Sequence, residues 1–212
     1  MRETRPVTIH DVARHAGVAV SSVSRALSDH PDVSASMRAK VRAAADELGY
    51  APDLIARSMR SGTTGVVGLV VRDYATPFFG EVIRGIDEVM SDAGYTLIVT
   101  SSGRDAAHES KVIGTLRQRR VEALMLATVS DRDPATRKAL AAYDRPLVLL
   151  DRQFPRLSVP RILFDHASGV RDATADLLAK GHRRIAFVTG TPDVRPTRER
   201  LRGFVAAYRD AG

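Results

Sequence analysis

The pattern of apolar and polar positions changes once along the chain, near residue 65. Before that point, apolar residues recur three and four positions apart in short segments, which predicts small amphipathic helices. After it, short continuous apolar runs alternate with segments of helical periodicity, which predicts buried strands alternating with helices. The pattern therefore indicates a small helical part followed by a larger α/β part.

Residues 8–27 read as two short helices joined by a tight turn. Thr8 is a suitable N-cap, and Asp11 follows it at capping-box distance. Gly17 supplies the backbone freedom that a sharp turn requires, and Val18 is placed to fill the corner between the helices. The apolar positions at helical spacing are Ile9, Val12, Ala13, Ala16, Val23, Ala26 and Leu27.

The second of these helices has a small, polar outer face with one basic side chain. Ser21, Ser22, Ser24 and Arg25 point away from its apolar side. A short helix of this kind suits the major groove of DNA. The sequence alone therefore favours a helix-turn-helix.

A third helix is expected between Ser34, as its N-cap, and Gly49, as the residue that ends it. Residues 53–60 can then form a helix of about two turns, and residues 61–65 read as a flexible joint. A helix this short is not stable alone in water. Two interpretations stay open: an element that folds on contact with DNA, and an ordinary linker with a helical tendency.

From residue 66 the pattern predicts an α/β fold with an open, doubly wound parallel sheet. Ligands in such sheets bind beyond the carboxyl ends of the strands. The loops there carry aromatic, acidic and basic residues, which suits a small polar ligand such as a sugar or nucleoside, although each residue taken singly has an ordinary structural explanation. The expected strands are 66–71, 95–100, 121–127, 146–150, 161–164 and 185–189, and the expected helices are 79–93, 107–119, 134–143, 168–179 and 197–209.

Composition narrows the class of protein. The chain has 212 residues, 44% of them hydrophobic, and no cysteine, so disulfides and thiolate metal sites are excluded. No apolar run reaches the length of a membrane span and no signal-peptide pattern opens the chain, so we expect a cytoplasmic protein without membrane contact. The net charge of +7 invites a nucleic-acid partner. Residues 180–212 carry eight basic and three acidic side chains, however, so most of the excess lies outside the helix-turn-helix.

No catalytic constellation is present in the sequence. The P-loop, the dinucleotide fingerprint, the nucleophile elbow and the zincin motif are all absent. His108 and Glu109 lack a second histidine four residues on, and the six histidines show no metal-ligand spacing. We therefore expect no catalytic residue, no metal and no cofactor, and a protein that is not an enzyme.

Two stretches of the chain resemble the LacI family of bacterial transcription regulators. The first is residues 7–27 with residues 33–62, and the second is a set of motifs at 76–86, 93–99, 145–152, 181–190 and 198–204, in the family's order. The resemblance implies a helix-turn-helix head at 1–51, a hinge helix and linker at 52–64, and a periplasmic-binding-protein-like body. Its N-terminal subdomain would span 65–166, and its C-terminal subdomain would begin at 167–212 and be truncated.

The resemblance also assigns roles to particular residues. Val20, Ser21 and Arg25 correspond to groove-facing positions of the recognition helix, Ser22 and Ser24 to phosphate or groove contacts, and Met59 to the apolar lever that wedges into the minor groove. The implied DNA-binding residues are Thr8, Val20, Ser21, Ser22, Ser24, Arg25, Tyr50, Ala56 and Met59. The implied effector-binding residues are Phe79, Asp151, Asp165 and Arg200.

Three departures from the family pattern stand out. Ala19 replaces the usual Ser or Thr that caps the recognition helix, at a cost on the order of 1 kcal/mol. His166 replaces the Asn that commonly follows the strand-end Asp. The chain also stops within the C-terminal subdomain, so we expect a fragment or truncated product with weak or absent effector binding.

The leading hypothesis is a repressor that binds a palindromic operator in double-stranded DNA as a homodimer and responds to a small-molecule effector. A solute-binding module of the periplasmic-binding-protein type fits the body alone, but the helix-turn-helix and the missing signal pattern argue against it. An enzyme on the same fold is disfavoured by the lack of catalytic motifs.

Overall fold

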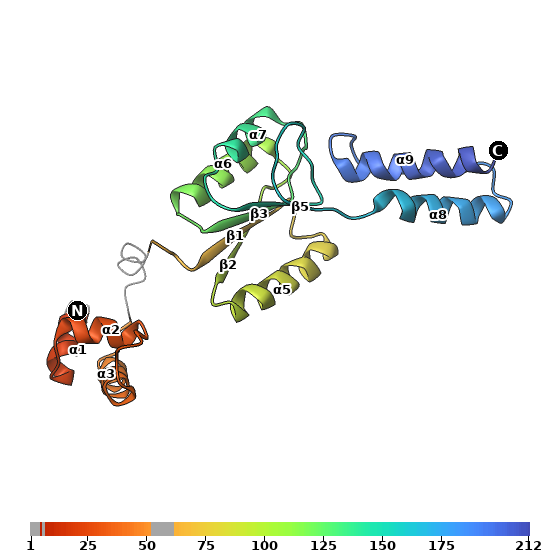
Figure 1. The fold of residues 1–212 in the computed structure, drawn as a ribbon. Helices are drawn as coiled ribbons and strands as arrows, with labels where there is room; N and C mark the ends of the chain where they lie inside the picture. Colours follow the sequence, from red (N-terminus) through yellow and green to blue (C-terminus); the bar gives the residue numbers. More distant parts are fainter. Residues whose placement is uncertain (1–4, 6, 52–61) are drawn as a thin grey trace. The chain divides into compact units, whose positions relative to one another are not determined.

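The computed structural model describes residues 5, 7–51 and 62–212, which form two compact units, Met1–Thr63 and Thr64–Gly212 (Figure 1). The described residues of the first unit form three helices, and the second unit contains a parallel sheet with helices. Residues 53–60, for which the sequence predicts a short helix, lie outside the described residues, as do Ala56 and Met59.

The first unit is a three-helix head with a small, alanine-rich core. Its helices are α1 (Ile9–Ala16), α2 (Val20–Leu27) and α3 (Ala35–Glu47), and each contacts the other two. The Ser34 hydroxyl accepts the Met37 N–H at the start of α3, as its N-cap position predicts. The buried core residues are Val12, Ala13, Ala16, Val23, Ala26, Val41, Ala44 and Ala45. Their spacing is the helical spacing seen in the sequence.

The second unit contains a five-stranded parallel sheet with the strand order β2-β1-β3-β4-β5. The sheet begins with β1 (Val66–Val71), a continuous apolar run that is almost wholly buried. The other strands are β2 (Thr96–Ser101), β3 (Ala123–Leu126), β4 (Leu147–Leu150) and β5 (Arg161–Ile162). β1 lies between β2 and β3, with Leu69 opposite Val99 on one side and Met125 on the other.

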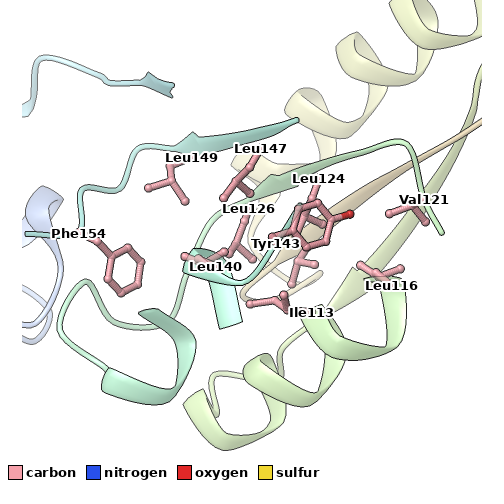
Figure 2. Close-up of a cluster of buried hydrophobic side chains, with 11 residues drawn as sticks. Ile113, Leu116, Val121, Leu124, Leu126, Leu140, Tyr143, Leu147, Leu149 and Phe154 are labelled. Atoms are coloured by element: carbon pink, nitrogen blue, oxygen red, sulfur yellow. The ribbon is translucent and has the colours of Figure 1, made fainter. Parts of the chain in front are cut away.

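Helices cover both faces of this sheet. α6 (Ala106–Gln118) and α7 (Pro134–Ala141) cover one face, and α5 (Pro77–Asp92) covers the other (Figure 1). Figure 2 shows the core beneath α6 and α7, where Ile113 and Leu116 of α6 meet Leu124 and Leu126 of β3. The α5 face is built on Leu69, Val71, Phe79, Ala127 and Leu150. Burial on both faces explains why the strands are continuously apolar, and the predicted doubly wound α/β fold is confirmed.

The predicted strand at 185–189 is wrong. These residues belong to no sheet in the described chain. The segment instead rests on α9 (Arg195–Asp210), because Phe187 stacks on Phe204 with ring centroids 5.0 Å apart and the Ile185 N–H donates to the Tyr208 hydroxyl. An apolar run forms a strand only where a second extended segment offers backbone partners.

α8 (His166–Ala179) and α9 pack side by side after the sheet (Figure 1). The Asp165 carboxylate caps α8 by accepting the Ser168 N–H. Gly203 of α9 is buried against the first turn of α8. None of the described helices is long and apolar enough to cross a membrane.

Candidate functional site

The turn between α1 and α2 is built as the sequence predicts. Gly17 adopts a left-handed conformation with φ of 62°, and the Val18 N–H returns to the Ala13 carbonyl. At the start of α1, the Asp11 carboxylate accepts both the N–H and the hydroxyl of Thr8. These two bonds lower the pKa of Asp11 and hold the helix entrance at Thr8.

The outward face of α2 carries the side chains that the sequence assigns to DNA. Ser21 and Arg25 are exposed, while Val20, Ser22 and Ser24 are half-buried. Within the described chain, the Arg25 guanidinium has no hydrogen bond or ion pair, so it is free to meet a partner. Ala19 occupies the N-cap position of α2 and makes no capping bond. Tyr50, which follows α3, packs half-buried against the head core.

A cavity of about 670 Å³ opens in the second unit at the carboxyl ends of β1, β4 and β5. Predicted residues Phe79, Asp151 and Arg200 line it, and they come from α5, the end of β4 and α9. The full lining is Arg72, Thr76, Phe78, Phe79, Val82, Ile86, Leu150, Asp151, Arg152, Ile162, Phe164, His166, Gly190, Val194, Pro196, Thr197 and Arg200. A cavity at this edge of a parallel sheet is a usual place for a ligand.

Asp165, which the resemblance also assigns to the effector site, is not among the residues that line this cavity. Its carboxylate is engaged at the N-terminus of α8 with the Ser168 N–H, which lowers its pKa. His166 lines the cavity instead, and its Nε2 atom lies 2.7 Å from Oδ2 of Asp151. The replacement of the family's Asn by histidine therefore places an aromatic base in the cavity wall.

Asp151 is the only carboxylate in the described cavity lining, and it is held from several sides. Besides His166, Nη1 of Arg195 lies 3.4 Å from its Oδ1 atom. The backbone of Asp151 has a φ of 55°, a left-handed conformation that costs free energy in a non-glycine residue. This conformation places the side chain beside α9 and the end of β5.

A buried polar network beside the cavity, which includes the lining residue Arg152, was not predicted from the sequence. Arg152 is 4% exposed, and its guanidinium donates to the carbonyls of Thr128 and Asp151. Asp131 is 0% exposed and pairs with Arg198 at 3.1 Å, while its carboxylate also accepts the Arg195 N–H. This network ties the end of β3 to the start of α9. The available signal was the position of Asp131 in the loop that follows a buried strand.

Glu109 of α6 is the second buried acid that sequence reasoning missed as a site residue. It is 0% exposed, and its carboxyl group accepts the Val129 N–H at 2.8 Å and the Thr136 hydroxyl at 3.2 Å. Burial raises its pKa to about 7, although these two hydrogen bonds oppose the shift. Its spacing from Ile113 and Leu116 on the inward face of α6 was the signal that could have found it.

The raised pKa of Glu109 predicts a specific pH dependence of stability. Between its ordinary pKa of 4.5 and about 7, the folded chain keeps a proton that the unfolded chain has released. Stability from this group is therefore full below pH 4.5 and is lost as pH rises through about 7. We expect the unfolding free energy of the parent, relative to Glu109→Gln, to fall by up to about 3 kcal/mol across this range. Urea titrations at several pH values measure this difference, and a constant difference would contradict the assignment.

Both parts of the chain match known families. Residues 8–53 match the model of bacterial regulatory proteins of the lacI family, and residues 64–212 match that of periplasmic binding proteins and the sugar binding domain of the LacI family. The chain is 36% identical over 207 residues to the ribose operon repressor of Escherichia coli (strain K12), covering 97% of this chain and 62% of that protein. It is 35% identical to the HTH-type transcriptional repressor PurR of Photobacterium profundum, covering 97% and 61%.

Solved structures of related regulators have a similar fold. The lac repressor dimer bound to operator and the anti-inducer ONPF superposes with a TM-score of 0.84 at 27% identity, covering 97% of this chain and 62% of that one. The complex of the transcriptional regulator CelR with cellobiose gives a TM-score of 0.63 at 31% identity, covering 98% and 62%. The chain thus spans about three fifths of the length of the proteins it matches.

Proposed function

Because the chain belongs to the LacI family of bacterial regulatory proteins, we propose that it is a sequence-specific DNA-binding regulator of transcription and not an enzyme. It acts as a repressor in the cytoplasm and binds a palindromic operator as a homodimer. A small-molecule effector of the sugar or nucleoside class controls it. Its parts are the head at 1–51, the hinge helix and linker at 52–64, and the two subdomains of the body at 65–166 and 167–212.

The observation that carries this proposal is the outward face of α2. It presents small polar side chains and one guanidinium that has no partner in the described chain. A guanidinium on such a helix can read a guanine edge in the major groove. The proposed DNA contacts are Thr8, Val20, Ser21, Ser22, Ser24, Arg25 and Tyr50, with Ala56 and Met59 in the hinge. The proposed effector contacts are Phe79, Asp151, Asp165 and Arg200, and His166 lines the same cavity.

Arg25→Ala tests the DNA-binding assignment. We expect specific affinity for a palindromic site, selected from random DNA with the parent chain, to fall about tenfold or more, because a bidentate base contact contributes about 1–3 kcal/mol of discrimination. Non-specific affinity should change little, because only one of the positive charges that are attracted to the DNA phosphates is lost. A mobility-shift series at matched salt measures both affinities.

Lys40→Ala is the matched control. Lys40 is an exposed cation on α3 that lies outside the proposed recognition helix, so its removal should leave specific binding within about twofold of the parent. The assignment of α2 as the recognition helix is wrong if Arg25→Ala binds the selected site as tightly as the parent.

A further inference from the structure

The cavity of the second unit has an excess of positive charge. Three guanidinium groups, those of Arg72, Arg152 and Arg200, line it against the carboxylate of Asp151. A cavity for a neutral sugar needs balanced donors and acceptors, whereas a cationic excess in a partly buried site favours an anion. A bound anion would be held by those of the three cations that the protein itself does not neutralise.

Arg152 and Asp151 are satisfied within the protein. Arg152 donates to the carbonyls of Thr128 and Asp151, and its Nε atom lies 3.8 Å from Asp131. Asp151 is held by His166 at 2.7 Å and by Arg195 at 3.4 Å. Neither group therefore neutralises the two remaining cations.

Arg72 has no partner for its guanidinium group among the described residues. Its Nε atom is buried and has no hydrogen bond, and its guanidinium forms no ion pair in the part of the chain that the structure describes. The neighbouring Asp73 carboxylate binds Arg104 at 2.6 Å. Burial lowers the pKa of Arg152, and the negative charge of Asp131 opposes this shift. The positive charge of Arg72 lowers the pKa of Arg152 further, because the two guanidinium groups repel each other. A buried donor that is left unsatisfied is costly unless a ligand completes it.

Arg200 is the second uncommitted cation. It is half-buried on α9, lines the same cavity, and makes no hydrogen bond or ion pair with any described residue. Its neighbours on α9 differ in this respect, because Arg198 is bound to Asp131 and Arg202 to Glu199. Arg72 follows β1 and Arg200 lies on α9, so the two approach the cavity from separate elements.

The rest of the wall is apolar and aromatic. Phe78 lies edge-to-face with Phe79 and with Phe164, at centroid distances of 5.4 and 5.5 Å. Phe78 and Phe164 are still 47% and 40% exposed, and Val82, Ile86 and Ile162 extend the apolar surface. Such a wall suits the carbon framework of a ring-shaped ligand.

We propose that this cavity binds a small organic anion, with a ring-shaped body against Phe78 and Phe164 and a phosphate ester or carboxylate held by Arg72 and Arg200. The inference rests on the proposed function, in which the cavity is the effector site, and narrows the effector to the charged members of its class. A guanidinium group can donate two parallel hydrogen bonds to two oxygens of a phosphate or carboxylate. Because Arg72 and Arg200 approach the cavity from different elements, both can contact the same anionic group.

Matched pairs of charged and neutral probes test the proposal. Calorimetric titrations of the 212-residue chain use ribose 5-phosphate against ribose, glucose 6-phosphate against glucose, and glucuronate against glucose. We expect at least one anion to bind tenfold or more tightly than its neutral parent, with an affinity that falls as NaCl is raised. The phosphate and carboxylate arms show which anionic group the site prefers.

Substitutions locate the charge effect. Arg72→Gln and Arg200→Gln keep a hydrogen-bond donor and remove the charge, and each is expected to weaken the preferred anion about tenfold while changing its neutral parent less than threefold. Arg137→Gln, on the exposed surface of α7 and away from the cavity lining, is the matched control. Thermal unfolding confirms that each variant is folded, and Arg200→Lys, which keeps the charge, should retain more anion affinity than Arg200→Gln.

Two results would overturn the proposal: neutral parents that bind as tightly as the anions in every pair, or Arg72→Gln and Arg200→Gln variants that behave like Arg137→Gln. The absence of binding to every probe would also overturn the proposal. Mobility shifts on selected DNA without any ligand test the proposed regulatory function separately. If the parent chain does not bind the DNA but still prefers the anions, only the proposed regulatory function is contradicted.

Discussion

Replacing Gly203 with alanine is expected to destabilise the second unit by about 3 kcal/mol. Gly203 of α9 faces the first turn of α8, where a Cβ atom would overlap the carbonyl oxygen of Ala167 and lie 2.9 Å from its carbonyl carbon. The obstructing atoms are backbone, so no side-chain rotation can relieve the contact. The two helices must move apart, and overpacking of this kind usually costs about 1–3 kcal/mol or more.

Gly169→Ala is the matched control for this prediction. Gly169 also lies in α8, but a Cβ atom there would meet no neighbouring atom. Alanine at such a helix position should stabilise the chain by up to about 1 kcal/mol. Urea unfolding compares both variants with the parent. Equal stability of Gly203→Ala and the parent would show that α8 and α9 do not pack as closely as described.

The same substitution also has a consequence for the proposed effector site. α9 carries Arg200 into the cavity wall and brings Arg195 to Asp151. A shift of α9 away from α8 would displace both side chains. We therefore expect Gly203→Ala to weaken binding of any cavity ligand in proportion to the displacement, whereas Gly169→Ala leaves it unchanged.

The head could be predicted from the sequence because its determinants are local. Gly17 has to end α1 in a left-handed conformation, and Ser34 has to cap α3, whatever the rest of the chain does. Among the described residues of the head, the apolar stripe of each short helix packs against the other two helices. The strand β1 could also be predicted locally, because a continuous apolar run indicates a strand that is buried on both faces.

The interior of the cavity could be predicted only in part. Loops after parallel strands must share one edge of the sheet, so Phe79 and Asp151 were placed near each other by topology alone. The role of Asp165 is harder to predict, because an aspartate after a strand can contact a ligand or cap the helix that follows, and the local sequence does not separate these roles. The sequence wrongly predicts a strand at 185–189, because a strand requires a partner that can be distant in sequence.

The buried charges were the least predictable feature. Asp131 meets Arg195 and Arg198 across more than sixty positions of sequence. Glu109 meets Val129 and Thr136 across twenty and twenty-seven. Whether such an acid is exposed or buried depends on the tertiary arrangement of these partners, and no local pattern encodes that arrangement.

Asp131→Ala has the second large expected effect. Its carboxylate is 0% exposed, pairs with Arg198 at 3.1 Å, and accepts the backbone N–H that begins α9 at Arg195. Its other oxygen lies 3.8 Å from Nε of Arg152. Truncation removes the acceptor of Arg198 and of the Arg195 N–H, and one of the two carboxylates near the buried Arg152 guanidinium, the other being Asp151 at 3.9 Å. Breaking a buried pair from one side typically costs about 3–5 kcal/mol.

Urea unfolding measures this loss, and Asp144→Ala is the control, since Asp144 is an exposed acid with a loose ion pair to Arg117 at 3.5 Å. The control should stay within about 0.5 kcal/mol of the parent. Amide hydrogen exchange should rise mainly at the start of α9, because Asp131 holds that end of the helix to β3. A double-mutant cycle with Arg198→Gln should give a coupling of about 0.5–3 kcal/mol. If the Asp131 and Asp144 variants are equally stable, the network does not fasten α9, and other contacts of this helix, such as its packing against α8 at Gly203 and the Arg195–Asp151 pair, must hold the cavity wall that carries Arg200.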